Sequence, residues 1–400
     1  MMEAYLLDWA NLLVRWLHLI SGIAWIGASF YFVMLDLSLR RPDKPGDQKR
    51  GVFGELWAVH GGGVYHSEKF LSGPLGEPLS EHLHWSKWEA YTTWLSGMGM
   101  LSIVYWFGAD TYLIDPSVMP LSVMQAIAIS FFSIVISWFI YDGLCRVLGD
   151  RENLLALALF IYIVLIDWIL FHLFSARAAY LHVGAVMGSI MVANVFFQII
   201  PGQKKMVAEI RAGQTPNPKY GIIGKQRSVH NTYFTLPVLF AMISNHYPMT
   251  YSHPQGWMVL IVIMLAGVLI RQFFVQRHLG LQQWWLPAVA IILLAGLMVW
   301  MQPPSVAVSI GEKISFSTVK PIFQQRCVPC HAQTPTQPGF AQPPKGVVLQ
   351  SRELILQHRA MITQTVGSRY MPIGNLTGMT DQERSTVMSW LAQIQQAEKP

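Results

Sequence analysis

Eight predominantly apolar stretches, each long enough to form a membrane-spanning helix, recur along the first 301 residues of this 400-residue chain. The hydrocarbon core of a bilayer is about 30 Å thick, which an α-helix crosses in about 20 residues. Asp, Glu, Lys and Arg make up only 12% of the chain, about half their share in soluble globular proteins. The pattern therefore predicts an all-α, eight-helix transmembrane bundle, with spans at 6–36, 90–108, 121–141, 153–174, 178–201, 229–247, 256–276 and 283–301.

Positive charges are distributed unevenly over the loops between these stretches. Seventeen Lys and Arg residues fall in or beside four alternate loops, whereas the other three loops contain only Arg177. Because Lys and Arg concentrate on the cytoplasmic side of membrane proteins, we predict that the amino terminus and, after eight crossings, the carboxyl terminus face outward. This topology explains the net charge of +6 without a nucleic-acid partner. The basic loops are 37–89, 142–152, 202–228 and 277–282, and the others are 109–120, 175–177 and 248–255.

Two of the stretches depart from a plain span. The first is longer than a span needs, and Glu3 and Asp8 lie at its start in place of the basic start of a signal peptide, so we expect it to stay as the first helix. The sixth contains Pro237, which should kink it, and neighbouring helices of a bundle can accommodate such a kink.

Beyond the last stretch the chain becomes more polar and contains the pattern Cys327-Val-Pro-Cys330-His331. In a C-x-x-C-H motif, two thiols about one helical turn apart can add to the two haem vinyl groups, and the adjacent histidine can ligate the iron. A thioredoxin-like pair would need a βαβ context, and a zinc site would need two further ligands nearby. We therefore predict a linker at 302–312 and a domain at 313–400 that carries one covalent haem c on Cys327 and Cys330.

The second axial ligand of the iron should come from the other side of the haem. Met371, followed by Pro372, lies in a predicted loop before a final helix at 381–395, and a methionine thioether raises the reduction potential of haem. We therefore predict His331 and Met371 as the iron ligands. Other methionines compete with Met371, but two of them fall in predicted helices, where core packing is the usual role. The competitors are Met379 and the helical Met361 and Met388.

The segment 313–398 resembles a class I cytochrome c domain. The resemblance rests on Pro321-Ile-Phe before the cysteine motif, Gly346-Val-Val-Leu after it, the Met-Pro loop, and Glu383 to Trp390 in the last helix. In bacteria, haem c is attached outside the cytoplasmic membrane, which agrees with the outward carboxyl terminus inferred from the charges. We expect a multi-pass protein of the bacterial inner membrane, with its amino terminus and its cytochrome domain in the periplasm.

Three histidines of the predicted spans attract attention, because ionisable groups inside a membrane are costly and usually functional. His18 lies near the middle of the first stretch, and His172 and His182 lie near the outer ends of the fourth and fifth. Asp167 is one turn deeper than His172. Since imidazole is a common haem ligand, we predict that these histidines bind haem b. The alternative is structural, with His18 hydrogen-bonded across the bundle and the other two as interfacial neighbours.

A second group of histidines lies in or near the predicted inner loop 37–89. Three consecutive glycines follow the first of these histidines, and they would either let the backbone approach a ligand closely or form only a tight turn. A zinc site of His60, His66, His82 and His84 and an aromatic belt after His84 are alternatives to a catalytic role. The catalytic candidates are His60, His66, His84, Glu89 and His230.

The chain contains two distinctive blocks, Gly54-Glu-Leu-Trp-Ala-Val-His-Gly-Gly-Gly-Val-Tyr-His66 and Glu81-His-Leu-His-Trp-Ser-Lys-Trp-Glu-Ala-Tyr-Thr-Thr-Trp94. Together with the eight spans and the carboxyl-terminal cytochrome c, these blocks resemble the membrane-bound urate oxidase (urate hydroxylase) family. The resemblance implies hydroxylation of urate to 5-hydroxyisourate with oxygen from water. Electrons would pass to haem c and then to a soluble or membrane-bound acceptor of the respiratory chain, without hydrogen peroxide. The pattern from Trp16 to Phe30 is also similar to copper-resistance D-type membrane proteins.

The implied reaction poses a problem of distance. If urate bound the inner histidines, electrons would have to cross about 30 Å of bilayer to reach a periplasmic haem, which is too far for one tunnelling step. Either the substrate site lies near the outer face, or a haem b bridges the gap. Two other classes of protein stay open: a transmembrane electron conduit or copper-handling module without an organic substrate, and a structural subunit of a larger respiratory complex. The long glycine- and histidine-rich loop favours an enzyme.

Overall fold

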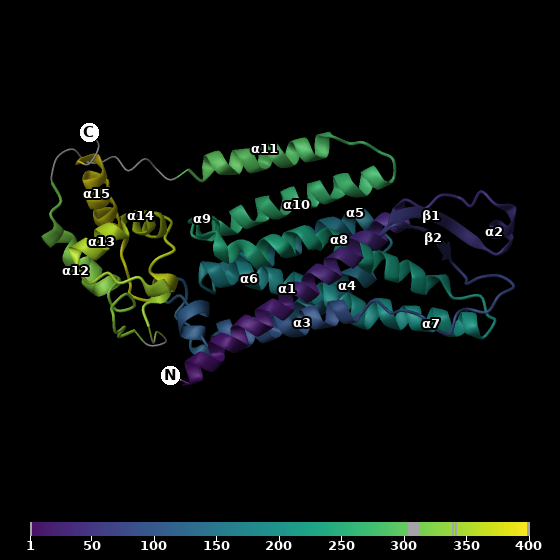
Figure 1. Cartoon of the computed structure of the whole chain (residues 1–400), viewed down its shortest axis with the longest axis horizontal. Helices are drawn as coiled ribbons and strands as arrows, with labels where there is room; N and C mark the ends of the chain where they lie inside the picture. Colours follow the sequence, from purple (N-terminus) through teal and green to yellow (C-terminus); the bar gives the residue numbers. More distant parts are fainter. Residues whose placement is uncertain (1, 303–312, 338–339, 341, 398–400) are drawn as a thin grey trace.

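The computed structural model describes residues 2–302, 313–337, 340 and 342–397. Its first part is a bundle of long helices, and a smaller group of short helices lies at one end of the bundle (Figure 1). The long helices of the bundle are α1 (Met2–Leu37), α3 (Trp88–Leu101), α4 (Val123–Leu148), α5 (Glu152–Phe171), α6 (Ala176–Ala193), α8 (Pro218–Ile243), α10 (Gly256–His278) and α11 (Trp285–Trp300).

Among the described residues, five helical stretches are long and apolar enough to cross a membrane, as a multi-pass membrane protein requires. Large apolar side chains cover the outside of the bundle, and Phe139 and Ile291 are 68% and 67% exposed. Such a surface suits hydrocarbon better than water. The eight-span topology and its orientation stay predictions. The five stretches are Tyr5–Leu37, Val123–Leu148, Glu152–Phe171, Ala176–Arg211 and Gly256–His278.

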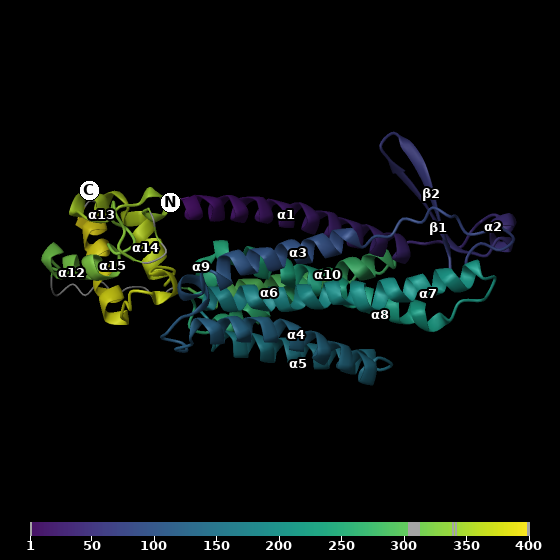
Figure 2. The ribbon, with the colours of Figure 1, turned by 90° about the horizontal axis from the view of Figure 1, so that it is seen from below.

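Helix α6 lies at the centre of the bundle, between α4, α5 and α8 (Figure 2). Its residues Val183, Val186 and Ile190 are fully buried. Gly184 lets α8 come close, because a Cβ at this position would lie only 2.8 Å from the Cβ of Ala241. Small residues at helix contacts allow this close packing in membranes.

At the end of the bundle that carries the basic loops, several helices are longer than predicted. Helix α6 continues through η3 (Asn194–Ile199) into α7 (Ile200–Arg211), and α8 begins at Pro218 rather than at 229 and runs through Pro237. Asn217 caps α8 by accepting a hydrogen bond from the N–H of Lys219, and proline suits the first turn of a helix. These helices extend into polar sequence, which hydropathy alone assigns to loops.

Irregular helical turns extend the bundle at its other end. Helix α3 gives way to the π-helical turns η1 (Ser102–Trp106) and η2 (Ala109–Leu113), beyond the predicted end at 108. The segment between α8 and α10 folds into η4 (Ser244–His246) and α9 (Pro248–Tyr251).

The loop predicted at 37–89 contains α2 (Pro45–Lys49) and an antiparallel hairpin of β1 (Val52–His60) and β2 (Gly63–Phe70). The fold is therefore mostly helical rather than all-α. Gly61 and Gly62 have φ values of +58° and +79°, and a two-residue turn with positive φ at both positions matches the twist of a hairpin. The glycine run thus forms a tight turn.

The C-terminal helices have a hydrophobic core of their own, in which Phe323 and Trp390 are almost fully buried. The final helix predicted at 381–395 is confirmed. The predicted linker at 302–312 lies outside the described residues, apart from Gln302. The elements are α12 (Phe316–Arg326), η5 (Pro344–Gly346), α13 (Arg352–Gln357), α14 (Arg359–Gly367), η6 (Ile373–Asn375) and α15 (Asp381–Ala397).

The start of α1 and the C-terminal helices lie at one end of the molecule, and the hairpin and α7 lie at the opposite end (Figures 1 and 2). The C-terminal helices touch the bundle directly, because η6 contacts η2 and Tyr370 packs against the buried core of the bundle. The predicted topology, with both termini on one side of a membrane, requires this arrangement of ends.

The close contact of α6 with α8 predicts opposite effects for two glycines about one turn apart. Gly184→Ala should lower the free energy of unfolding by about 1–3 kcal/mol, because the added methyl group would overlap Ala241. At Gly188 an added Cβ would meet no atom within 4 Å, so Gly188→Ala should be neutral or raise it by about 0.5–1 kcal/mol. Thermal unfolding in detergent measures both, and equal responses would contradict this packing.

Candidate functional site

The cysteine motif begins where α12 ends. The N–H of Cys327 donates to the carbonyl of Phe323 at 2.9 Å, and the N–H groups of Cys330 and His331 donate to the carbonyl of Cys327 at 3.2 and 2.9 Å. This turn places both cysteines and His331 in the wall of one pocket, which Met371 also lines. We call it the cysteine pocket, and it brings together the four residues predicted to hold haem c.

Hydrogen bonds fix the orientation of His331. Its Nδ1 lies 2.9 Å from the carbonyl oxygen of Val347, so Nδ1–H donates there and Nε2 keeps a free lone pair. Its own carbonyl accepts a hydrogen bond from the N–H of Leu349 at 2.8 Å. Histidines that bind metals commonly donate from one ring nitrogen in this way while the other binds the metal. The imidazole is thus prepared to ligate iron.

The main chain of Met371 is held at both of its polar groups. Its N–H donates to the carbonyl of Thr365 at 3.0 Å, and its carbonyl accepts from Nη1 of Arg384 at 2.8 Å. Met361 and Met379 also line the cysteine pocket, so Met379 stays an alternative to Met371 as the predicted iron ligand. The predicted helical positions of two other methionines are confirmed, Met361 in α14 and Met388 in α15.

The chemistry of the cysteine pocket fits a haem c. Two thiols, an imidazole and a thioether are the donor set of a His/Met cytochrome c, and aliphatic side chains such as Val347 and Ile362 surround them. Burial raises the pKa of the Cys327 thiol to about 12, whereas a thioredoxin-like pair has a thiol with a lowered pKa. These observations favour haem attachment over a dithiol redox pair.

An ion pair ties the cysteine motif to the last helix. Arg326 donates from Nε and Nη2 to the carboxylate of Glu383 at 3.0–3.1 Å, and its Nη1 donates to the carbonyl of Thr377. Burial raises the pKa of Glu383, but hydrogen bonds from the N–H of Thr380 and from Arg326 outweigh it and hold the pKa below its usual value. Glu383 is therefore charged at neutral pH and keeps α12 close to α15.

Two of the histidines predicted to bind haem b are engaged in hydrogen bonds of the bundle. The Nδ1 of His18 lies 2.9 Å from the carbonyl oxygen of Thr93. His182 is fully buried, and both of its ring nitrogens have partners, the carbonyl of Ala178 and the hydroxyl of Ser130, each at 2.7 Å. His182 would have to give up one of these hydrogen bonds to ligate iron.

The third histidine, His172, faces away from the interior. It is exposed, and its Nδ1 lies 2.7 Å from the carbonyl oxygen of Trp168. Asp167, one turn deeper in the sequence than His172, is fully buried, and its carboxylate has no hydrogen-bond partner among the described residues. These contacts do not test whether His18, His172 and His182 hold a common iron, so the haem b stays a prediction.

The histidines of the inner loop do not form one site either. His60 lies exposed beside the turn of the hairpin, and His66 places its Nε2 2.7 Å from the carboxylate of Glu55. His82 and His84 are exposed in the coil that follows. The described residues contain no group of three or more His, Cys, Asp or Glu placed to hold a metal ion, so the zinc alternative gains no support.

The remaining catalytic candidates lie apart from the hairpin histidines. His230 is inside the bundle, where its Nδ1 lies 2.7 Å from the hydroxyl of Tyr141 and 3.8 Å from the Sγ of Cys145. Cys145 is a free, buried thiol. Glu89 lies in the first turn of α3. The five residues predicted to be catalytic therefore do not converge.

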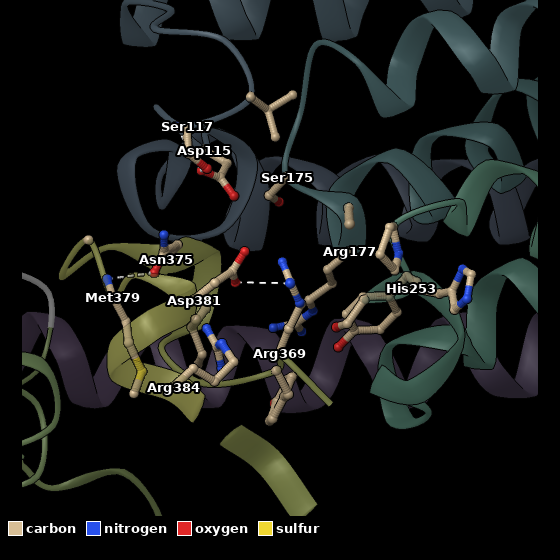
Figure 3. A pocket seen from close by; sticks show the side chains of 18 of the residues that line it. Asp115, Ser117, Ser175, Arg177, His253, Arg369, Asn375, Met379, Asp381 and Arg384 are labelled. Atoms are coloured by element: carbon tan, nitrogen blue, oxygen red, sulfur yellow. Dashed lines mark hydrogen bonds and ion pairs between the residues drawn. The ribbon is translucent and has the colours of Figure 1, made fainter. Parts of the chain in front are cut away.

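Sequence reasoning missed a cavity of about 620 Å³ at the junction between the bundle and the C-terminal helices (Figure 3). The bundle contributes the segments 111–118, 175–177 and 251–254, and the C-terminal helices contribute residues of 369–384. We call it the junction cavity. One sequence feature could have indicated it: Arg177, which lines the cavity, is the only Lys or Arg of the predicted outer loops.

The junction cavity and the cysteine pocket are neighbours. Ile373 and Met379 appear in the lining of both. A molecule in the junction cavity would therefore be separated from a haem in the cysteine pocket by little more than one layer of side chains. None of His18, His172 and His182 lines either space.

The depressed pKa of Glu383 predicts a pH-dependent stability. Glu383→Gln should lower the stability of the C-terminal helices at pH 7 by about 1 kcal/mol, the scale of a well-formed, partly exposed ion pair. This contribution is present above the unfolded pKa of about 4.3 and is lost as pH falls through the lower folded pKa. Calorimetric unfolding of the full chain should show the variant and the parent converging in acid. A difference that persists there would contradict the assignment.

Comparisons with known proteins agree with part of the sequence interpretation. Residues 4–302 match the family model described as urate oxidase N-terminal. No curated protein and no solved structure matches the chain. Since the family match covers most of the chain, the protein belongs to the urate oxidase N-terminal family.

Proposed function

We propose that the protein is a cytochrome c-linked urate oxidase of the bacterial inner membrane. It hydroxylates urate to 5-hydroxyisourate with oxygen from water and transfers the electrons to its own haem c, from which they pass to an acceptor of the respiratory chain. Because dioxygen is not the electron acceptor, no hydrogen peroxide forms. Eight helices cross the membrane, and the amino terminus and the haem domain face the periplasm.

One observation carries this proposal. The chain that matches the urate oxidase N-terminal family over residues 4–302 continues into a pocket lined by two thiols, an imidazole and a thioether. A bound electron carrier on the same chain is useful to an oxidase only if the electrons of the substrate leave through it. The family match supports urate as the substrate, and the donor set of the pocket supports a c-type haem as the first acceptor.

The reaction balances with water as the source of oxygen. The urate monoanion and one water molecule give 5-hydroxyisourate, one proton and two electrons, with the new C–O bond at C5. Haem c, held by Cys327, Cys330, His331 and Met371, supplies a one-electron acceptor when bound. Two transfers are therefore needed for each urate. The protein must also hold the charge of the purine anion and accept the proton that water releases.

The place of substrate binding decides whether a second haem is needed. At the inner group of His60, His66, His84, Glu89 and His230, oxidation would need a bridging cofactor across about 30 Å, for which His18, His172 and His182 are the candidate ligands. At the outer end of the bundle, electrons would reach haem c directly. A pyridine haemochrome spectrum of fully active protein decides between these arrangements, because c-type haem alone excludes the bridge.

Urate should reduce the haem c of the isolated protein. Urate added without oxygen to the oxidised full-length chain should produce the α-band of ferrous haem c, with two haems reduced for each urate consumed. In ¹⁸O-labelled water, the labelled oxygen should appear in 5-hydroxyisourate. Reduction by a quinol but not by urate would contradict the proposal and indicate an electron conduit. Activity found only with copurifying subunits would indicate a structural component of a larger complex.

The assignment of Met371 as iron ligand predicts a selective change in reduction potential. Met371→Leu keeps the volume of the side chain but removes the thioether, so the potential should fall by on the order of 0.1 V or more, with loss of the far-red band of methionine-ligated ferric haem. Met361→Leu is the matched control at the same pocket and should change neither. A shift in Met379→Leu instead would transfer the assignment to Met379.

A further inference from the structure

The junction cavity has a polar lining with an excess of positive charge. Three arginines line it, one from the bundle and two from the C-terminal helices, against two aspartates. Figure 3 shows Arg177 on the bundle side and Arg369, Asp381 and Arg384 on the other side. Asp381 is paired with Arg369 at 2.9 Å, and Asp115 accepts hydrogen bonds from Ser117. The formal charge of the lining is therefore positive by one, which favours an anion.

Arg177 is the arginine most available to such an anion. Among the described residues it forms no ion pair, and its Nε has no hydrogen-bond partner although it is buried. Its guanidinium lies over the ring of Tyr112, 5.3 Å from the ring centroid. A partly buried cation without an acidic partner costs free energy, and an anion bound beside it would offset that cost.

Arg384 has a similar free donor. Its Nη1 is used by the carbonyls of Val366 and Met371 at 2.6 and 2.8 Å. Its Nε is buried and has no partner. Arg384 thus lines the junction cavity while it holds the main chain of the predicted iron ligand.

The aromatic lining suits a planar ligand. Tyr112, Tyr251 and Tyr370 all line the cavity, and aromatic rings stack well on purines. Tyr251 is only 4% exposed, yet its hydroxyl has no hydrogen-bond partner. Buried hydroxyls are nearly always hydrogen-bonded, so an unpartnered one in a cavity wall indicates that a ligand supplies the partner. The volume of about 620 Å³ is in the range of small-molecule sites.

We propose that the junction cavity is the binding site for the anionic purine substrate, an inference that rests on the urate oxidase activity proposed above. Arg177 and the Nε of Arg384 bind the anionic edge of the purine, the hydroxyl of Tyr251 hydrogen-bonds to it, and the tyrosine rings contact its faces. Because Ile373 and Met379 line both spaces, the purine lies next to haem c. Its electrons then need neither a path across the membrane nor a second haem.

Direct binding of urate to the full-length protein tests this site. With the haem fully reduced and oxygen excluded, urate binds without being consumed, and equilibrium dialysis gives its Kd. Arg177→Gln should raise the Kd about 10- to 100-fold, since hydrogen bonds to a charged group are strong. Tyr251→Phe should raise it about 3- to 10-fold. Its thermal unfolding should not change, because the lost hydroxyl has no partner in the free protein.

Arg271→Gln is the matched control. Like Arg177, Arg271 has a buried Nε without a hydrogen-bond partner among the described residues, and its guanidinium lies over an aromatic ring, 4.3 Å from the ring centroid of Phe30. It lies on α10, outside the cavity lining. Its variant should bind urate as the parent does.

Three results would overturn the proposal in distinguishable ways. A Kd unchanged in both Arg177→Gln and Tyr251→Phe, while urate still reduces haem c in the parent, overturns the site and leaves the proposed function standing. An equal loss of binding in Arg271→Gln indicates a general effect of removing a buried arginine and overturns the site. A parent protein that neither binds urate nor is reduced by it overturns the proposed function together with the site. If Arg177→Gln does not fold, the Kd of Tyr251→Phe decides.

Discussion

The hydrocarbon core of a membrane contains no water, so polar groups of a membrane-spanning bundle must find hydrogen-bond partners within the protein. The outer surface of this bundle is largely apolar, whereas several polar side chains lie buried between the helices and are hydrogen-bonded there. The carboxylate of Asp142 accepts a hydrogen bond from the buried Arg227 at 2.7 Å, and His182 is bonded at both ring nitrogens. Much of the polar chemistry inside the bundle is therefore committed to holding helices together. A site that binds a polar substrate is easier to build where the helices end and a second group of helices covers them.

The junction with the C-terminal helices is such a place. Tyr370 packs on the core of the bundle and is followed directly in the chain by Met371, the predicted iron ligand. Arg384 links the two spaces again, because it lines the junction cavity and donates to the carbonyl of Met371. A substrate held at this junction needs only a short electron path to a haem in the cysteine pocket. In this proposal, the same short segment of chain connects the attachment of the C-terminal helices, the ligation of haem and the binding of substrate.

The sequence predicted those features of the fold and the site that depend on residues close together in the chain, and it missed those that depend on contacts between distant segments. Apolar length showed where the bundle helices lie, but their polar extensions, such as α7 and the start of α8 at Pro218, carry no hydropathy signal. The C-x-x-C-H motif is local, so it identified Cys327, Cys330 and His331, which share one pocket. The inner histidines were grouped by loop, yet a tight turn exposes His60 while His230 faces Tyr141 inside the bundle. The junction cavity joins the segment 111–118 to residues of 369–384, more than 200 positions later in the chain, and no local sequence pattern indicates such a contact.

We propose that substrate oxidation takes place at the end of the bundle that carries the C-terminal helices. Sealed vesicles with the full-length protein in one orientation test this claim directly, because a purine anion crosses a bilayer slowly. With the C-terminal helices on the outside and a haem that starts oxidised, urate added outside should reduce haem c at once, and urate enclosed inside should not. Reduction only by enclosed urate would contradict the account and place the substrate at the end that carries the hairpin.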